Sequence, residues 1–170
     1  MLDETIITEV PPLYQCYGRM GEQVGVPIMG THARRVLHGA LNIGSGELLL
    51  LITDEWVQET PQAFLAMIRA HWRGWNIALF EGRGSPPAAG ESRHMAKELH
   101  RELRFLPKAT PELNAMDHLW RHVKGQALAN WPIQSIDAAA DGACRHLLEM
   151  SRQERLRKAG VLSGHFWLTK

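Results

Sequence analysis

Cysteine, net charge and long apolar runs are all scarce in this chain, and each shortage bears on the class of protein. Its two cysteines, Cys16 and Cys144, form no C-x-x-C pair, so they predict neither a disulfide framework nor a zinc ribbon and fit a reducing compartment. The 19 basic and 18 acidic residues give a formal net charge of +1, which neither favours nor excludes a nucleic-acid partner. No apolar stretch, Leu48 to Ile52 included, is long enough to cross a bilayer.

The amino end also lacks the pattern of a secretory signal. Carboxylates stand in MLDETIITEV where a signal peptide has a basic end followed by an apolar run, so we expect a cytoplasmic protein. A length of 170 residues suffices for one domain with a core and hardly for two. The composition, 45% apolar and 22% charged, is that of an ordinary globular domain and indicates no function by itself.

Hydrophobic periodicity predicts strands in the first part of the chain and helices toward its end. Strands are expected over 1–7, 35–43, 48–53, 76–80 and 103–106, with a glycine-rich turn at 44–47 and loops at 8–32 and 81–91. Helices are expected over 61–72, 92–101, from Pro111 onward and from about 135 to 150, with Thr60 and Thr110 as N-caps. An antiparallel hairpin followed by alternating helices and strands predicts an α/β domain with a mixed sheet covered by helices.

Several carboxylates stand where a sheet could gather them. Asp3 and Glu4 lie in the first strand, Glu81 follows the fourth, and Asp117 lies in the long helix. Hard divalent cations such as Mg²⁺ and Mn²⁺ take oxygen ligands, and a pair of them can activate an attacking oxygen and stabilise a leaving one in phosphodiester chemistry. Most acidic residues at strand ends are merely solvated, however, and the default partner of Asp117 is Arg121 one helical turn on.

The segment FLPKATPELNAMDHLWRHVK, residues 105–124, resembles the third-carboxylate motif of bacterial mariner-type DDE transposases. That motif has leucine-proline, a polar turn, P-E-L-N-P, a carboxylate, and then L-W and a basic helix; the carboxylate here is Asp117. LDET at 2–5 is similar to the family's first-aspartate strand, and RRVLHGALNIGSGELLLL to its central hairpin. The likeness covers nearly the whole chain and implies a ribonuclease H-like fold, with a mixed five-stranded sheet between helices.

The middle ligand position departs from the family. Thirty-four residues separate Gly82 from Asp117, the spacing that the family has between its second aspartate and its third carboxylate, and Pro87 stands where the family has a histidine. Glycine offers no side-chain oxygen to a metal, so the resemblance implies a weakened metal site. Glu81 is a candidate substitute, but neighbouring strand residues face opposite sides, so it would need a bulge or twist to reach the ions.

The resemblance therefore implies the catalytic domain of a DNA transposase in a degenerate copy with little or no strand cleavage. Asp3 and Asp117 would be catalytic residues that bind two Mg²⁺ or Mn²⁺ ions, and Arg121 and Lys124 would contact the DNA backbone. Transposon ends and target DNA would be the partners of a homodimer, or of an association with an intact copy, in the bacterial cytoplasm. The chain would be one domain, 1–170, with an incomplete first strand and without the family's preceding helix-turn-helix modules.

Other interpretations stay open from the sequence. The chain could be a non-catalytic remnant that binds DNA weakly, or that pairs with an intact transposase and inhibits it. The gene could also be decaying without a selected role. Arg121 and Lys124 could equally belong to the solvated face of an amphipathic helix rather than to a DNA interface.

Overall fold

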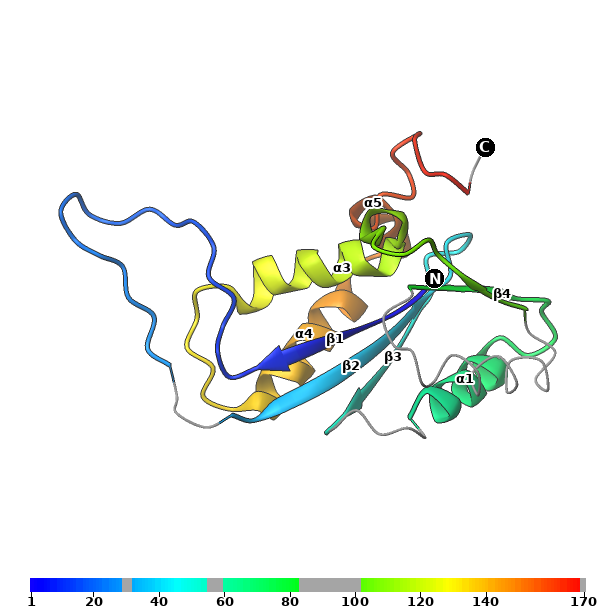
Figure 1. The fold of residues 1–170 in the computed structure, drawn as a ribbon, viewed down its shortest axis with the longest axis horizontal. Helices are drawn as coiled ribbons and strands as arrows, with labels where there is room; N and C mark the ends of the chain where they lie inside the picture. Colours follow the sequence, from blue (N-terminus) through cyan, green and yellow to red (C-terminus); the bar gives the residue numbers. More distant parts are fainter. Residues whose placement is uncertain (29–31, 55–59, 83–101, 169–170) are drawn as a thin grey trace.

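The computed structural model describes residues 1–28, 32–54, 60–82 and 102–168. Five strands form one sheet in the spatial order β3-β2-β1-β4-β5 (Figure 1). Strand β1 is antiparallel to β2 and β2 to β3, whereas β4 runs parallel to β1 and β5 parallel to β4. The strands are β1 Leu2–Thr8, β2 Arg34–Leu41, β3 Leu48–Thr53, β4 Ala78–Glu81 and β5 Glu102–Phe105.

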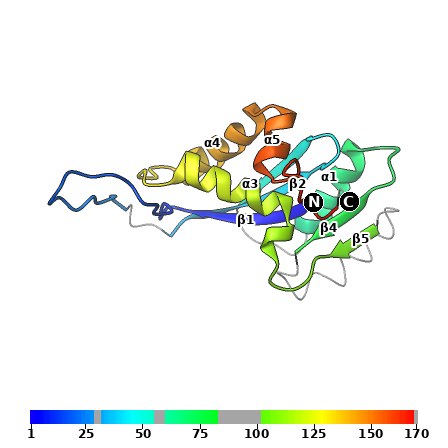
Figure 2. The same cartoon turned by 90° about the horizontal axis from the view of Figure 1, so that it is seen from above.

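Helices cover both faces of this sheet (Figures 1 and 2). Helix α1, Thr60–His71, packs on one face against β3. Helices α3, Ala115–Val123, and α4, Ile136–Glu149, pack on the other face against β1 and β2, and α5, Arg152–Lys158, lies against α3. The predicted α/β architecture is confirmed, and no helix within the described ranges has the length and hydropathy needed to cross a membrane.

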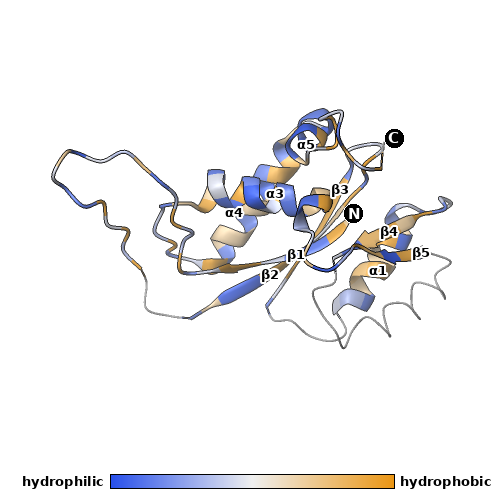
Figure 3. Cartoon of the chain, turned by 45° about the horizontal axis from the view of Figure 1, so that its top comes forward, coloured by the Kyte–Doolittle hydropathy of each residue, from blue (hydrophilic) through white to orange (hydrophobic). Residues whose placement is uncertain are grey.

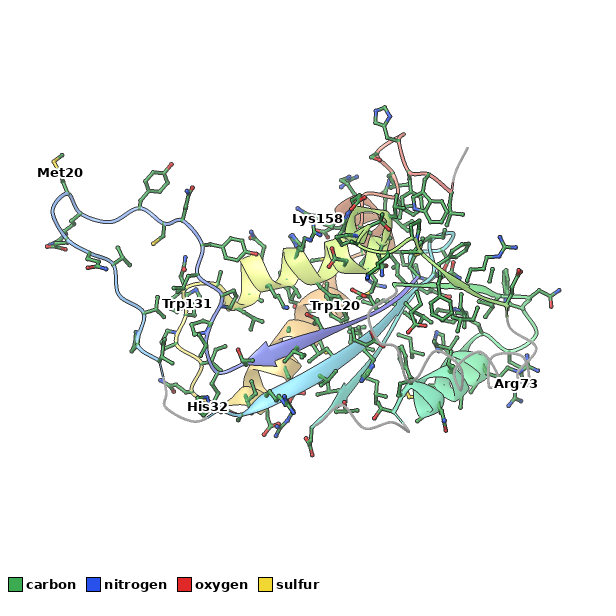
Figure 4. All side chains as sticks on the ribbon, viewed as in Figure 1. Met20, His32, Arg73, Trp120, Trp131 and Lys158 are labelled. Atoms are coloured by element: carbon green, nitrogen blue, oxygen red, sulfur yellow. The ribbon has the colours of Figure 1, made fainter. Side chains whose placement is uncertain are left out.

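The alternation of side chains along β1 divides the core into two clusters. Leu2 packs beneath α1, while Ile7 joins the larger cluster under α3 and α4. Because strand side chains alternate between faces, Asp3 falls on the α3 side and Glu4 on the α1 side. Figure 3 shows the hydrophobic strands β3 and β4 and the hydrophilic start of β2. Trp120, 2% exposed, lies between α3 and the sheet (Figure 4).

The predicted hairpin is present, and the loop before it extends far from the sheet. Gly46, with φ +73°, closes the turn between β2 and β3, where its amide donates to the Asn42 carbonyl at 2.7 Å. Residues 9–28 project as a long loop with Met20 at its tip (Figures 1 and 4). Its base is held at Asn130, whose side chain accepts from the Tyr14 amide at 3.0 Å and donates to the Tyr14 carbonyl at 3.1 Å. The predicted helix over 92–101, like Pro87, lies outside the described residues.

The predicted start of the third helix is wrong. Residues Pro111–Leu113 form a single 3-10 turn, and the Thr110 hydroxyl donates to the Pro107 carbonyl at 2.8 Å instead of capping it. Asn114 begins α3: its backbone is extended, and its side-chain oxygen accepts from the Met116 amide at 3.1 Å. The amide nitrogens of a first helical turn lack partners within the helix, and the asparagine supplies one.

Gly39 in β2 lies directly under α3, where an added Cβ atom would come within 2.5 Å of Met116 and 2.6 Å of Trp120. We expect Gly39→Ala to lower the free energy of unfolding by about 1–3 kcal/mol, because the core is already filled there. Urea denaturation measures the change. The control is Gly142→Ala in α4, where a Cβ meets nothing within 4 Å and alanine should stabilise by up to about 1 kcal/mol. A Gly39→Ala chain as stable as the parent would contradict this account of the packing.

Candidate active site

One cavity of about 160 Å³ is lined by Asp3, Gly82 and Asp117. Asp3 lies in β1, Gly82 directly follows β4, and Asp117 lies in the first turn of α3. Because β1 and β4 run parallel with Leu2 opposite Glu81, Gly82 comes level with Asp3 on the same face of the sheet. The structure thus brings together both predicted carboxylates and the glycine at the predicted middle position.

Asn114 sets the position of α3 relative to β1. Its side-chain nitrogen donates to the Leu2 carbonyl at 3.0 Å, while its oxygen caps the helix, and the residue is only 2% exposed. A single side chain therefore begins α3 and attaches it to the residue next to Asp3. The predicted cap at Thr110 is wrong, and this role of Asn114 was not predicted, although an asparagine just before an apolar helical pattern is itself an N-cap signal.

Acidic charge accumulates around Asp3. Burial raises the pKa of Asp3 to about 8, and the negative charges of Glu4, Asp117 and Glu81 act in the same direction. A carboxyl group among like charges and away from water favours any state that cancels its charge, either by binding a proton or by facing a cation. The cavity is therefore electrostatically suited to a positive ion.

Two basic side chains accompany Asp117. Nη2 of Arg121 lies 2.7 Å from the buried Oδ2 of Asp117 and forms an i,i+4 ion pair with it. Burial lowers the pKa of Lys124, while the carboxylates of Asp117 and Asp3 act in the opposite direction. The ion pair expected for Asp117 is thus present. Lys124 lies close enough to Asp117 and Asp3 for their charges to raise its pKa.

Glu81 lies on the α1 side of the sheet. Together with Glu4 it lines a small cavity of about 20 Å³ that Asp3 also borders, and burial, followed by the charge of Glu4, raises the pKa of Glu81 to about 7. Oε1 of Glu4 is 3.8 Å from Nδ1 of the buried His38 on the neighbouring strand. Strand β4 pairs with β5 in regular register from Ala78 to Glu81, so these four residues contain no bulge that would turn Glu81 to the other face.

The side chains of the cavity are of the type that binds a divalent cation, but the carboxylates that line it are only two, Asp3 and Asp117. Asp3 and Asp117 supply the carboxylate oxygens that Mg²⁺ and Mn²⁺ prefer. Across the described parts of the chain, no group of three or more His, Cys, Asp or Glu residues is placed to hold a metal ion. A Cβ atom added at Gly82 would meet nothing within 4 Å, so the cavity has room for a side chain at this position.

Comparisons with known proteins bear on the family and the fold. A family model described as DDE superfamily endonuclease matches residues 1–139. The solved structure entitled "Crystal structure of the Mos1 Strand Transfer Complex" matches with a TM-score of 0.71 and 17% identity over 97% of this chain and 51% of that chain. The mariner Mos1 paired end complex with Mg matches with a TM-score of 0.72 and 18% identity, over 97% of this chain and 52% of that chain. The paired end complex with Mn matches with a TM-score of 0.68 and 16% identity over the same shares of the two chains. No curated protein matches the chain.

At identities this low the structural match concerns the fold, and it confirms the predicted ribonuclease H-like arrangement of a mixed five-stranded sheet between helices. The chain spans about half the length of the Mos1 chains that it matches. The matching fold thus covers nearly the whole of the present chain. The positions of the individual carboxylates come from the structure of this chain and not from those matches.

The double role of Asn114 predicts an unusually large effect of its removal. Asn114→Ala should lower the free energy of unfolding by about 2–4 kcal/mol, because it removes an N-cap and also leaves the buried Leu2 carbonyl without that donor. Ser135→Ala is the matched control, since the Ser135 side chain only caps α4, and should lower it by about 1 kcal/mol. Equal losses in chemical denaturation would mean that the bond to Leu2 contributes nothing.

The raised pKa of Asp3 predicts a pH dependence of stability. The folded chain holds this proton more tightly than the unfolded chain, so the stabilisation is complete below about pH 4 and is lost as the pH rises toward about 8. Asp3→Asn should flatten this decline in thermal unfolding without divalent ions, whereas Glu149→Gln, at the exposed end of α4, should leave it unchanged. Superimposable pH profiles for the parent and Asp3→Asn would exclude Asp3 as its source.

Proposed function

The chain belongs to the DDE superfamily endonuclease family, and on this basis we propose that it is the catalytic domain of a DNA transposase with a degenerate metal site. The observation that carries the proposal is the meeting of Asp3 and Asp117, from a strand and a distant helix, in one cavity. The solved structures of similar fold are titled as Mos1 strand-transfer and paired-end complexes. Transposon ends and target DNA are accordingly the proposed partners, bound by a dimer in the cytoplasm.

In this proposal Asp3 and Asp117 hold Mg²⁺ or Mn²⁺ through their carboxylate oxygens. The ions, when bound, supply the activation of water and the stabilisation of the leaving oxygen in phosphodiester cleavage. The carboxylates repel one another, and a cation between them would relieve that repulsion. Arg121 and Lys124, beside the same cavity, contact DNA phosphates and orient the strand.

The degenerate state is part of the proposal. Gly82 comes level with Asp3 and contributes no carboxylate, so an ion there has one side-chain ligand and one negative charge fewer than in an intact site. Glu81 does not replace it, because its side chain faces α1 with Glu4. We therefore expect weak or no strand cleavage by the chain as it stands.

A second candidate function follows from the same glycine. A chain that lacks the middle ligand but keeps the basic residues beside the cavity would act as a DNA-binding or dimerisation remnant, able to inhibit an intact transposase. A gel-shift assay with and without Mg²⁺, run beside a plasmid-nicking assay, separates the two. Binding without nicking under all metal conditions favours the remnant.

Restoring the missing carboxylate tests the assignment. Gly82→Asp should tighten Mn²⁺ binding by about tenfold or more, measured by calorimetry or by the electron paramagnetic resonance of free Mn²⁺, because the added group completes the ligand set. Gly82→Asn is the matched control: it fills the same space, which is open within 4 Å of the Cβ, without adding charge.

The same series checks the other ligands. Asp117→Asn in the Gly82→Asp background should remove the gain in Mn²⁺ affinity, since both carboxylates line the one cavity. A Mn²⁺ titration identical in Gly82→Asp and in the parent would refute the metal site. Tighter binding without any gain in nicking would favour the DNA-binding remnant over the enzyme.

A further inference from the structure

The side chain of Trp167 contacts two segments that lead to the acidic cavity. Its indole Nε1 donates to the Leu113 carbonyl at 2.9 Å. Its ring packs edge-on against Phe80, with ring centroids 5.5 Å apart and an interplanar angle of 83°. Leu113 ends the 3-10 turn before α3, and Phe80 lies in β4. After α5 the chain runs back on the side of the sheet that carries α3, where Trp167 meets both segments (Figure 1).

Both contacts lie close in sequence to a position of the candidate site. Leu113 lies four residues before Asp117, which stands in the first turn of α3. Phe80 lies two residues before Gly82 and packs against the core cluster under α3. Because side chains alternate along a strand, positions 80 and 82 lie on the same face of the sheet. Trp167 therefore bridges the helix that carries Asp117 and the strand that leads to Gly82.

Backbone pairing leaves the position of β4 relative to α3 largely to side chains. Among the residues that the structure describes, β4 pairs with β1 at one position. The bond from the Asn114 side chain to the Leu2 carbonyl attaches α3 to β1, the strand of Asp3. That bond fixes α3 relative to Asp3, and it sets no distance between α3 and β4. The contacts of Trp167 supply the second connection, between α3 and the strand before Gly82.

We propose that Trp167 is a positioning residue of the candidate metal site, which holds the middle position at Gly82 at a fixed distance from Asp117. The inference rests on the proposed transposase function and adds to it a residue outside the cavity. An indole suits this role because its N–H group only donates and fixes one contact, while its ring edge makes the other. Residues that hold metal ligands in place from outside change metal affinity without touching the ion.

Mn²⁺ binding in a double-mutant cycle tests this role. Trp167→Phe keeps an aromatic ring beside Phe80 but removes the N–H donor to Leu113. In the Gly82→Asp background it should weaken Mn²⁺ binding by about tenfold, because the restored carboxylate is no longer held against α3. In the parent, which lacks that carboxylate, the Mn²⁺ affinity should change by less than about twofold. Ser135→Ala, which removes only the cap of α4, is the matched control and should weaken Mn²⁺ binding in neither background.

A distance measurement without metal separates this inference from the metal site. Spin labels at Ala78→Cys in β4 and at Gln126→Cys after α3, both exposed positions, report the separation of the two segments by double electron–electron resonance. The background carries Cys16→Ser, because that cysteine is exposed and the other is buried. Trp167→Phe should broaden the distance distribution, and Trp167→Ala should broaden it further. Ser135→Ala should leave it unchanged.

Two results would overturn the inference. One is a distance distribution that neither Trp167 variant changes. The other is an equal loss of Mn²⁺ affinity in both backgrounds, because Trp167 would then act on the stability of the chain and not on the middle position. If Gly82→Asp alone brings no gain in Mn²⁺ affinity, the proposed metal site fails, and the distances measured without metal still decide the role of Trp167.

Discussion

The hydrogen bond from the Asn114 side chain to the Leu2 carbonyl is the contact on which the candidate site depends. It joins a helix to a strand that lies 112 residues earlier in the chain, and it does so at the residue next to Asp3. The same side chain caps α3, so the direction of the helix and its attachment to the sheet are set together. Asp117, three residues further on, is thereby carried to the cavity that Asp3 lines.

That arrangement works against stability. Asp3 is buried beside other acidic groups, and its pKa of about 8 means that ionising it in the folded chain is unfavourable. Arg121 and Lys124 offset part of the negative charge from the helix side. Local conflicts of this kind are expected where a fold keeps residues for binding or catalysis rather than for packing. A cation in the cavity would remove the conflict.

The pleat of the sheet explains why Glu81 does not share the cavity of Asp3 and Asp117 in the proposed metal site. Residues one apart on a strand face opposite sides, so Asp3 and Gly82 open toward α3 while Glu4 and Glu81 face α1. Glu81 is adjacent in sequence to Gly82 and still lies on the other side of the sheet from the cavity that Gly82 lines.

The amino-acid sequence by itself determined the features that depend on short-range patterns. These are the hairpin at Gly46, the succession of strands and helices, and the motif that singled out Asp117 and, through its spacing, Gly82. The tertiary structure alone decided that the Asn114 side chain binds the Leu2 carbonyl, that Gly82 comes level with Asp3, and that burial raises the pKa of Asp3. Each of these depends on contacts between segments far apart in the chain, and periodicity and propensity carry no information about such contacts.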